Sequence, residues 1–160
     1  MGKAVLIAKL KEYFSIYELV DEPTYKKFKD KAWQFFDYDT LLCLLIIREG
    51  IGRSMTINNW YWNGQFSQRG LRTNTSYIVK KKTNSNSLYL SAHVVGKGFD
   101  FDVKGMTADE VRTWIQDNAD LFSCKIRLEH KYAKSGKTIN WVHLDTYHTD
   151  NAPDIYLFNV

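Results

Sequence analysis

The chain has 160 residues, of which 44% are apolar and 15% aromatic. This composition excludes a disordered chain, and the length suits one domain with a substantial core. The net charge of +4 is modest. Lysine clusters such as Lys80, Lys81 and Lys82 favour solvated faces, with attraction to a polyanion (nucleic acid or an anionic wall polymer) as the alternative.

The cysteines and the N-terminal segment limit the protein class further. Cys43 and Cys124 lie far apart with no Cys-x-x-Cys pair, which excludes a cysteine zinc site. Cys43 lies in the run LLCLLII, where we expect a buried free thiol. The start, MGKAVLIAKLKEYF, lacks a cleavage-site pattern, and residues 41–47 are too few to cross a bilayer, which takes ~20 residues. We expect a soluble protein made in a cytoplasm, with no signal peptide and no membrane contact.

The first half of the chain reads as helical. Residues 24–36 (TYKKFKDKAWQFF) carry apolar residues at helical spacing, and residues 39–50 (DTLLCLLIIREG) end on a glycine, a helix stop. Residues 55–62 (MTINNWYW) predict a strand. Residues 63–90 are rich in Gly, Asn, Ser, Thr and Lys, so most of this segment is expected to be a long loop.

The second half of the chain reads as strands with one helix inserted. Residues 99–103 (FDFDV) alternate strictly between apolar and polar, as a half-buried strand should. A helix is predicted over residues 106–122, because Thr107 and Glu110 have the spacing of a capping box.

Two further alternating segments follow. Residues 123–130 (SCKIRLEH) and 140–146 (NWVHLDT) flank the turn-like segment KYAKSGKT, which predicts a hairpin. Helices that precede strands indicate an α+β fold with a small, largely antiparallel sheet backed by helices. No repeat and no linker divides the chain, so residues 1–160 are expected to form a single domain.

Strand parity gathers polar residues on one side of this sheet. Asp100 and Asp102 share one face of their strand, and His143 and Asp145 share one face of another. His93 lies just before the first of these strands, with two glycines allowing a tight turn between. Two histidines and one aspartate that converge would leave an open position, as in a catalytic zinc site. Taken alone, such residues are more often structural histidines and solvated carboxylates.

Three motifs in chain order resemble those of a known family. The segment SAHVVGKGFD (91–100) is similar to the first signature of the zinc D-Ala-D-Ala peptidases, Ser-x-His-x-x-Gly-x-Ala-x-Asp, with Gly98 in place of Ala. WVHLD (141–145) resembles the second signature, particularly in the phage and endopeptidase branch, and GLRT (70–73) resembles the family's Gly-Tyr/Phe-Arg-Ser. The upstream segments YFSIYELV, LLCLLIIREGIG and MTINNW resemble the family's N-terminal part, so the likeness covers most of the chain. It implies the hedgehog/D,D-peptidase fold, with zinc on the open face of the sheet.

The resemblance also implies roles for individual residues. His93, Asp100 and His143 would bind Zn²⁺, with water in the fourth position. Arg72 would pair with a substrate carboxylate or stabilise the developing oxyanion. Ser91 would support substrate binding through a hydrogen bond, since the metal supplies the nucleophile.

The general base is where the chain departs from the family pattern. Many members have Glu three residues before the last zinc histidine, a position held here by Asn140. Glu129, on the other strand of the hairpin, is slightly favoured as the replacement, although an exposed, ion-paired carboxylate is equally compatible with its position. Asp145 is the second candidate, or it orients His143 as an outer-shell partner.

The expected function is hydrolysis of a peptide bond in peptidoglycan stem peptides by a zinc carboxypeptidase or endopeptidase. Trp60 and Trp62 would line the substrate cleft, although aromatic strands are more often core. The missing export signal fits a phage endolysin that is stored in the host cytoplasm and reaches the wall after the membrane is opened. The alternative is a non-enzymatic zinc-containing phage structural or cell-wall-binding protein. No nucleic-acid partner is expected, because no binding motif accompanies the lysines.

Overall fold

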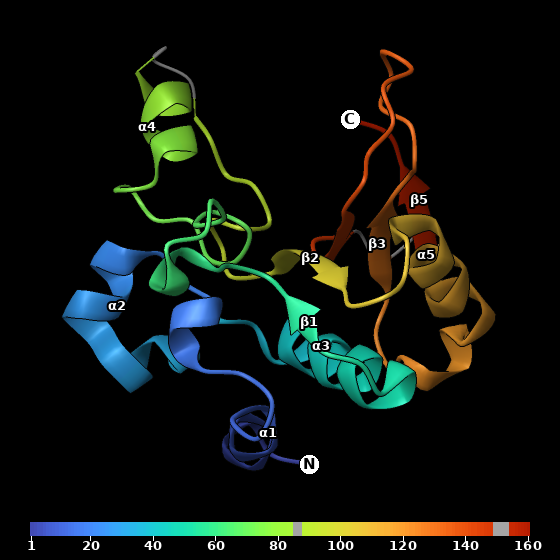
Figure 1. Ribbon diagram of the computed structural model, residues 1–160, viewed down its shortest axis with the longest axis horizontal. Coiled ribbons are helices and arrows are strands. Elements are labelled where there is room, and N and C mark those ends of the chain that lie inside the picture. Colours follow the sequence, from blue (N-terminus) through green and yellow to red (C-terminus); the bar gives the residue numbers. More distant parts are fainter. Residues whose placement is uncertain (85–87, 149–153) are drawn as a thin grey trace.

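The computed structural model describes residues 1–84, 88–148 and 154–160. Within these residues, helices occupy most of the first half of the chain, and four of the five strands lie in the second half (Figure 1). The α-helices are α1 (Lys3–Leu10), α2 (Glu22–Phe28), α3 (Tyr38–Ile51), α4 (Tyr77–Thr83) and α5 (Ala108–Asp117). The short 3-10 helices are η1 (Ile16–Glu18), η2 (Lys29–Phe35), η3 (Trp60–Trp62) and η4 (Ala119–Leu121). The strands are β1 (Met55–Thr56), β2 (Gly98–Val103), β3 (Ile126–Glu129), β4 (Val142–Asp145) and β5 (Ile155–Phe158).

The strands form one sheet in the order β1-β2-β4-β3-β5. All neighbouring strands are antiparallel except β3 and β5, which run parallel. The predicted hairpin is confirmed, since β3 pairs with β4 through Arg127 opposite Asp145 and Leu128 opposite Leu144. The α+β class and the largely antiparallel sheet are therefore confirmed, and the parallel β5 makes the sheet mixed.

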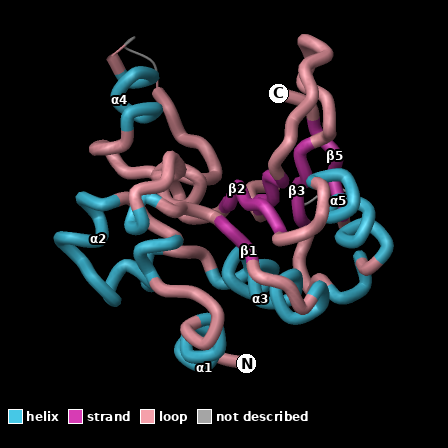
Figure 2. Tube along the Cα trace, viewed as in Figure 1, coloured by secondary structure: helices cyan, strands magenta, loops and turns pink. Residues whose placement is uncertain are grey.

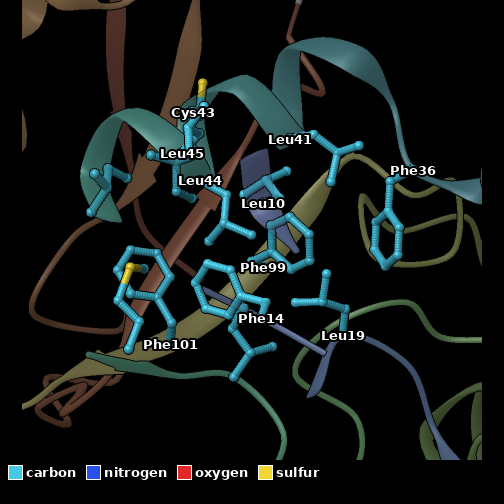
Figure 3. Packing of buried hydrophobic residues seen from close by; sticks show 14 of the residues in the cluster. Leu10, Phe14, Leu19, Phe36, Leu41, Cys43, Leu44, Leu45, Phe99 and Phe101 are labelled. Carbon is cyan, nitrogen blue, oxygen red and sulfur yellow. The ribbon is translucent and has the colours of Figure 1, made fainter. Parts of the chain in front are cut away.

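The core lies between one face of this sheet and the helices (Figures 2 and 3). Phe99 and Phe101 of β2 and Leu144 of β4 are buried in one cluster with Leu41 and Leu44 of α3. Helix α1 packs on α3, while α5 contacts β2 and β4. Burial of these side chains fixes which face of the sheet is apolar, and the opposite face is left for polar residues.

Helix α3 begins and ends close to the positions that the sequence predicts. Asp37 caps its N-terminus by accepting hydrogen bonds from the backbone N–H of Asp39 and Thr40. The helix runs one residue past Gly50 and ends at Gly52, which has a left-handed φ of 70°. Cys43 is fully buried as a free thiol, as predicted.

Two predictions for the first half of the chain are wrong in part. Residues 24–36 do not form one helix, because the chain breaks at Lys29, which has a φ of 48°, and continues as η2. A 3-10 helix repeats every three residues, so it gives nearly the same apolar spacing as an α-helix. Residues 55–62 form a strand only over β1. The chain then turns into η3, where the indole N–H of Trp60 donates to the Val20 carbonyl at 2.7 Å.

The remaining differences are smaller. The expected loop over residues 63–90 contains helix α4, and residues 85–87 of that segment lie outside the described residues. Helix α5 is shorter than the predicted 106–122, but the capping box of Thr107 and Glu110 is present. No helix in the described ranges is long and apolar enough to span a membrane.

Candidate metal centre

Strand pairing brings the polar residues of β2 and β4 together. Asp100 is paired directly with His143, and Gly98 with Asp145. Directly opposed residues in a sheet project to the same side, so the three polar side chains lie on the face away from the core. His93 joins them from the turn before β2, where it is 3% exposed.

Close packing explains both glycines between His93 and Asp100. Gly96 has a φ of 70°, and a Cβ there would lie 2.1 Å from the Phe35 carbonyl oxygen. A Cβ on Gly98 would lie 3.0 Å from the Ala92 Cβ and 3.1 Å from the Asp145 Cβ. The glycine at position 98 therefore relieves a tight contact beneath the candidate metal site.

Three potential ligand atoms converge. His93 Nε2 lies 3.2 Å from His143 Nδ1 and 3.3 Å from Asp100 Oδ1, and the last two atoms are 2.6 Å apart. Tetrahedral ligands at ~2.1 Å from zinc lie ~3.4 Å from one another, so two of the three separations already suit the ion. The predicted convergence is confirmed, and this buried group could hold a metal ion.

Hydrogen bonds fix which nitrogen of each histidine faces the metal position. His93 Nδ1 donates to the Gly70 carbonyl at 2.9 Å, which leaves Nε2 as the ligand atom. His143 Nε2 donates to Asp145 Oδ2 at 2.7 Å, which leaves Nδ1. Outer-shell partners of this kind orient the imidazoles of metal sites.

Asp145 is itself held from several sides. The Arg127 guanidinium binds both of its oxygens, at 2.7 and 2.9 Å, and the backbone N–H of Tyr147 donates to Oδ1 at 2.9 Å. The carboxylate is fully buried. A chain of contacts thus runs from Arg127 through Asp145 to the ligand nitrogen of His143.

The charges of the cluster support one another. Burial would lower the pKa of His143, but hydrogen bonds to Asp100 and Asp145 outweigh it and raise the pKa to about 9. Burial would raise the pKa of Asp100 and Asp145, but the imidazoles, and Arg127 at Asp145, hold both below the usual range. At His93 burial prevails and lowers the pKa, so its ring is neutral, as a metal ligand must be.

The three ligands lie in a cleft of about 460 Å³, here called the metal cleft. Its other lining residues include Arg72, Ser91, Glu129, Trp141, Tyr147 and Phe158. Glu129 is only 6% exposed, and continuation of the β3–β4 register places it opposite His143. Burial raises the pKa of its carboxyl group, which makes its carboxylate a stronger base than an exposed one.

Arg72 and Ser91 also reach this cleft, as predicted from the sequence. Arg72 donates to Asp100 Oδ2 at 3.0 Å and, through Nε, to the Gln68 carbonyl at 2.6 Å. The Ser91 hydroxyl oxygen is buried and, within the described residues, has no hydrogen-bond partner. A polar group left in this state on a cleft wall is suited to bind a ligand atom.

The other predicted residues lie elsewhere. Trp60 lines a separate depression beside α2, and Trp62 is 59% exposed and packs edge-on against Tyr17. The structure therefore does not bring Trp60 or Trp62 to the metal cleft. Asn140 is exposed and lines a different cleft beside α5, so it does not face the ligands either.

Sequence reasoning gave no site role to three residues of the metal cleft. Strand parity places Trp141 on the same face as His143 and Asp145, and Trp141 lines the cleft. Arg127 shares the parity of Glu129, but its pairing with Asp145 depends on strand register. Phe158 comes from β5, a strand that the sequence analysis did not predict. The centroid of its ring lies 5.7 Å from that of the His143 ring.

The donor set of two imidazole nitrogens and one carboxylate oxygen, with one side facing a cleft, suits Zn²⁺. The candidate ligands were assigned from the resemblance of the sequence motifs. The contacts that surround them were seen only in the structure. In comparisons with known proteins, no family model, no curated protein and no solved structure matches this chain.

Proposed function

We propose that the chain is a zinc-dependent peptidase that hydrolyses a peptide bond in peptidoglycan stem peptides. The supporting observation is the convergence of His93, Asp100 and His143 at a cleft that also receives the buried Glu129. The motifs that carry these ligands resemble the signatures of the zinc D-Ala-D-Ala peptidases, and the proposal includes their hedgehog/D,D-peptidase fold. Zinc bound there supplies a Lewis acid for the scissile carbonyl and for the attacking water.

Glu129 is assigned as the general base. Its carboxylate lines the metal cleft on the same sheet face as His143, and its raised pKa lets it take a proton from water and return it to the leaving amine. Asp145 is less suited, because Arg127, His143 and the Tyr147 N–H already bind its oxygens. Asp145 is therefore assigned to orient His143.

Arg72 and Ser91 are assigned to substrate binding. The Arg72 guanidinium is fixed against Asp100 and the Gln68 carbonyl, so its position is defined before substrate arrives. The Ser91 hydroxyl, which has no hydrogen-bond partner among the described residues, offers a hydrogen bond to the peptide backbone or terminal carboxylate. Trp141 and Phe158 add apolar walls to the cleft.

Metal analysis followed by mass spectrometry of digested peptidoglycan tests the proposal. The purified protein should hold about one Zn²⁺ per chain and release defined stem-peptide fragments, which also identify the bond that is cut. Chelation should abolish hydrolysis, and added zinc should restore it. Protein free of zinc after incubation with the ion would contradict the metal assignment, and zinc-loaded protein without activity would contradict the enzymatic one.

A second function is favoured by one observation. Asn140 occupies the position of the family's glutamate, cannot accept a proton and faces away from the metal cleft. A zinc-containing phage structural or cell-wall-binding protein would keep the ligands and lose the base. That protein would bind zinc and sediment with insoluble peptidoglycan, and its Glu129→Gln variant would sediment equally well. Release of peptide fragments by the unmodified protein excludes this alternative.

A further inference from the structure

Two cysteines far apart in the sequence meet at the edge of the core. Cys43 lies in the middle of α3 and is fully buried, while Cys124 lies just before β3 and is partly exposed. Their sulfur atoms are 3.6 Å apart, although 81 positions separate the residues. Figure 3 shows Cys43 on α3, projecting away from Phe99 and Phe101. The fold therefore creates a thiol pair that the sequence spacing does not suggest.

This pair is not part of a metal centre. In the portion of the chain that the structure describes, the group of three or more metal-ligating side chains is the one at the metal cleft. The reaction open to two thiols in contact, without a third metal-ligating group, is formation of a disulfide. Closing the distance to the ~2.05 Å of an S–S bond requires a movement of about 1.5 Å.

The two sulfurs have different environments, and this sets an order of reaction. The contact with Cys43 lowers the pKa of the Cys124 thiol, and the same contact together with burial raises the pKa of the Cys43 thiol well above its usual value. Cys124 is also the partner that solvent can reach. Because the thiolate is the attacking species, Cys124 is suited to react first and Cys43 second.

We infer that Cys43 and Cys124 form a reversible disulfide site that closes by exchange with a low-molecular-weight disulfide such as oxidised glutathione. The Cys124 thiol loses its proton and attacks one sulfur of oxidised glutathione, whose S–S bond breaks and releases one glutathione thiolate. Cys43 then loses its proton and attacks the Cys124 sulfur, which releases the second glutathione thiolate. The two protons end on the two thiolates, so two protein thiols are oxidised while one glutathione disulfide is reduced.

The bond would tie α3 to the chain that enters β3. Arg127 and Glu129 of that strand face the metal cleft, so the link would anchor the strand that supports the site. It would also close a long loop in the unfolded chain, which restricts the unfolded state. We expect the melting temperature to rise by about 5–10 °C on oxidation.

The experiment compares the full-length protein after incubation with dithiothreitol or with oxidised glutathione. The oxidised sample should lose the mass of two hydrogen atoms, resist alkylation at both cysteines, yield one cross-linked peptide and melt at the higher temperature. Dithiothreitol should reverse each change. Two alkylatable thiols after prolonged oxidation, or disulfide-linked dimers in place of the internal bond, would overturn the inference.

Two variants test the order of reaction. Cys43→Ser should stop at a stable mixed disulfide, with one glutathione attached to Cys124. Cys124→Ser should stay unmodified, because Cys43 is fully buried. Equal rates of glutathione attachment in the two variants would overturn the assigned order. The site does not depend on the metal, so the oxidised mass and the cross-linked peptide should appear whether or not zinc is bound.

Discussion

Buried charged side chains have different partners in two clefts of nearly equal volume. The metal cleft measures about 460 Å³, and the cleft beside α5, here called the α5 cleft, measures about 450 Å³. In the metal cleft, charged side chains meet one another, as at Asp100 and His143. In the α5 cleft, the buried Arg112 donates to the backbone carbonyls of Glu129, Ile139 and Trp141 at 2.9, 3.2 and 2.6 Å. Its charged neighbour, Asp109, is an exposed carboxylate at 3.7 Å.

The difference separates a charged side chain with fixed main-chain partners from charged side chains that could hold a metal ion. Arg112 binds main-chain oxygens that belong to the ends of β3 and β4, so its partners are fixed and its role is to join these segments. In the metal cleft an ion can replace the proton shared by His143 and Asp100 without leaving any group unpaired. The two clefts share Glu129, whose side chain faces one and whose carbonyl binds Arg112 of the other.

The largest effect is expected from removal of a ligand. His93→Ala takes one of three donor atoms from the metal site, so zinc affinity should fall by more than the ~100-fold that loss of an outer-shell partner costs. Equilibrium dialysis against buffered zinc measures this change. His130→Ala is the matched control, because that ring accepts a hydrogen bond from the Tyr132 N–H outside the metal cleft. Full zinc binding by His93→Ala would show that His93 is not a ligand, and the metal cleft would then have no more claim to a metal ion than the α5 cleft.

Glu129→Gln should leave zinc in place and remove the base. Turnover of a stem-peptide substrate should fall by roughly 10²–10⁴-fold, the usual worth of general acid–base catalysis. Zinc content, measured on the same preparation, should stay at the level of the unmodified protein, because Glu129 is not among the ligands. Asp145→Asn is the matched change. If it lowered turnover more than Glu129→Gln while zinc stayed bound, the role of base would pass to Asp145.

The sequence predicted those features of the fold and the candidate site that depend on residues near one another in the chain. Alternation alone placed Asp100, His143 and Asp145 on the polar face, because strand parity is a local property. The position of His93 followed from a motif whose glycines are required by close contacts, such as that of Gly96 with the Phe35 carbonyl. These local signals placed the residues on one face, and the resemblance of their motifs to a known family assigned them as candidate ligands.

Interactions between distant segments could not be predicted. The pairing of Arg127 with Asp145 depends on the register of β3 against β4, which turn chemistry and packing decide together. Trp60 and Trp62 fit a strand pattern, but packing against η1 and the bond from Trp60 to the Val20 carbonyl turn that segment into η3. Tertiary contacts overrode local propensity there.

Arg112→Met should damage the fold more than the chemistry. The change leaves three carbonyl groups without the Arg112 donor, two of them in buried hydrogen bonds and one in a part-buried one. We expect the free energy of unfolding to fall by about 2–4 kcal/mol in urea titrations. Zinc affinity of the folded fraction should change little. Lys131→Met, on an exposed side chain of the same cleft, is the control and should stay within about 0.5 kcal/mol. A loss of zinc binding as large as that of His93→Ala would show that the α5 cleft serves the metal site directly.

Arg127→Gln should weaken zinc binding without removing a ligand. The variant keeps a polar side chain but loses the paired contacts that hold Asp145, so His143 is less well oriented. Zinc affinity should fall by about 10–100-fold, as is typical for outer-shell partners. Arg69→Gln breaks an ion pair with Asp102 on the same sheet, in which neither side chain is among the candidate ligands or bonded to one, and should leave affinity unchanged. Equal losses in the two variants would attribute the effect to sheet stability.

The pH dependence of zinc affinity distinguishes a proton from zinc in the same site. The folded pKa of His143 is about 9, above its ordinary 6.5. In metal-free protein this group therefore stabilises the fold fully below about pH 6.5, and its contribution is lost as the pH rises through 9. Zinc needs the unprotonated Nδ1, so its apparent affinity should rise between pH 6.5 and 9, by up to about tenfold per pH unit. Melting curves with chelator and with zinc should diverge as the pH increases over this range. A zinc-dependent shift in melting temperature that stays constant with pH would show that no proton is displaced, and His143 would then not be a ligand.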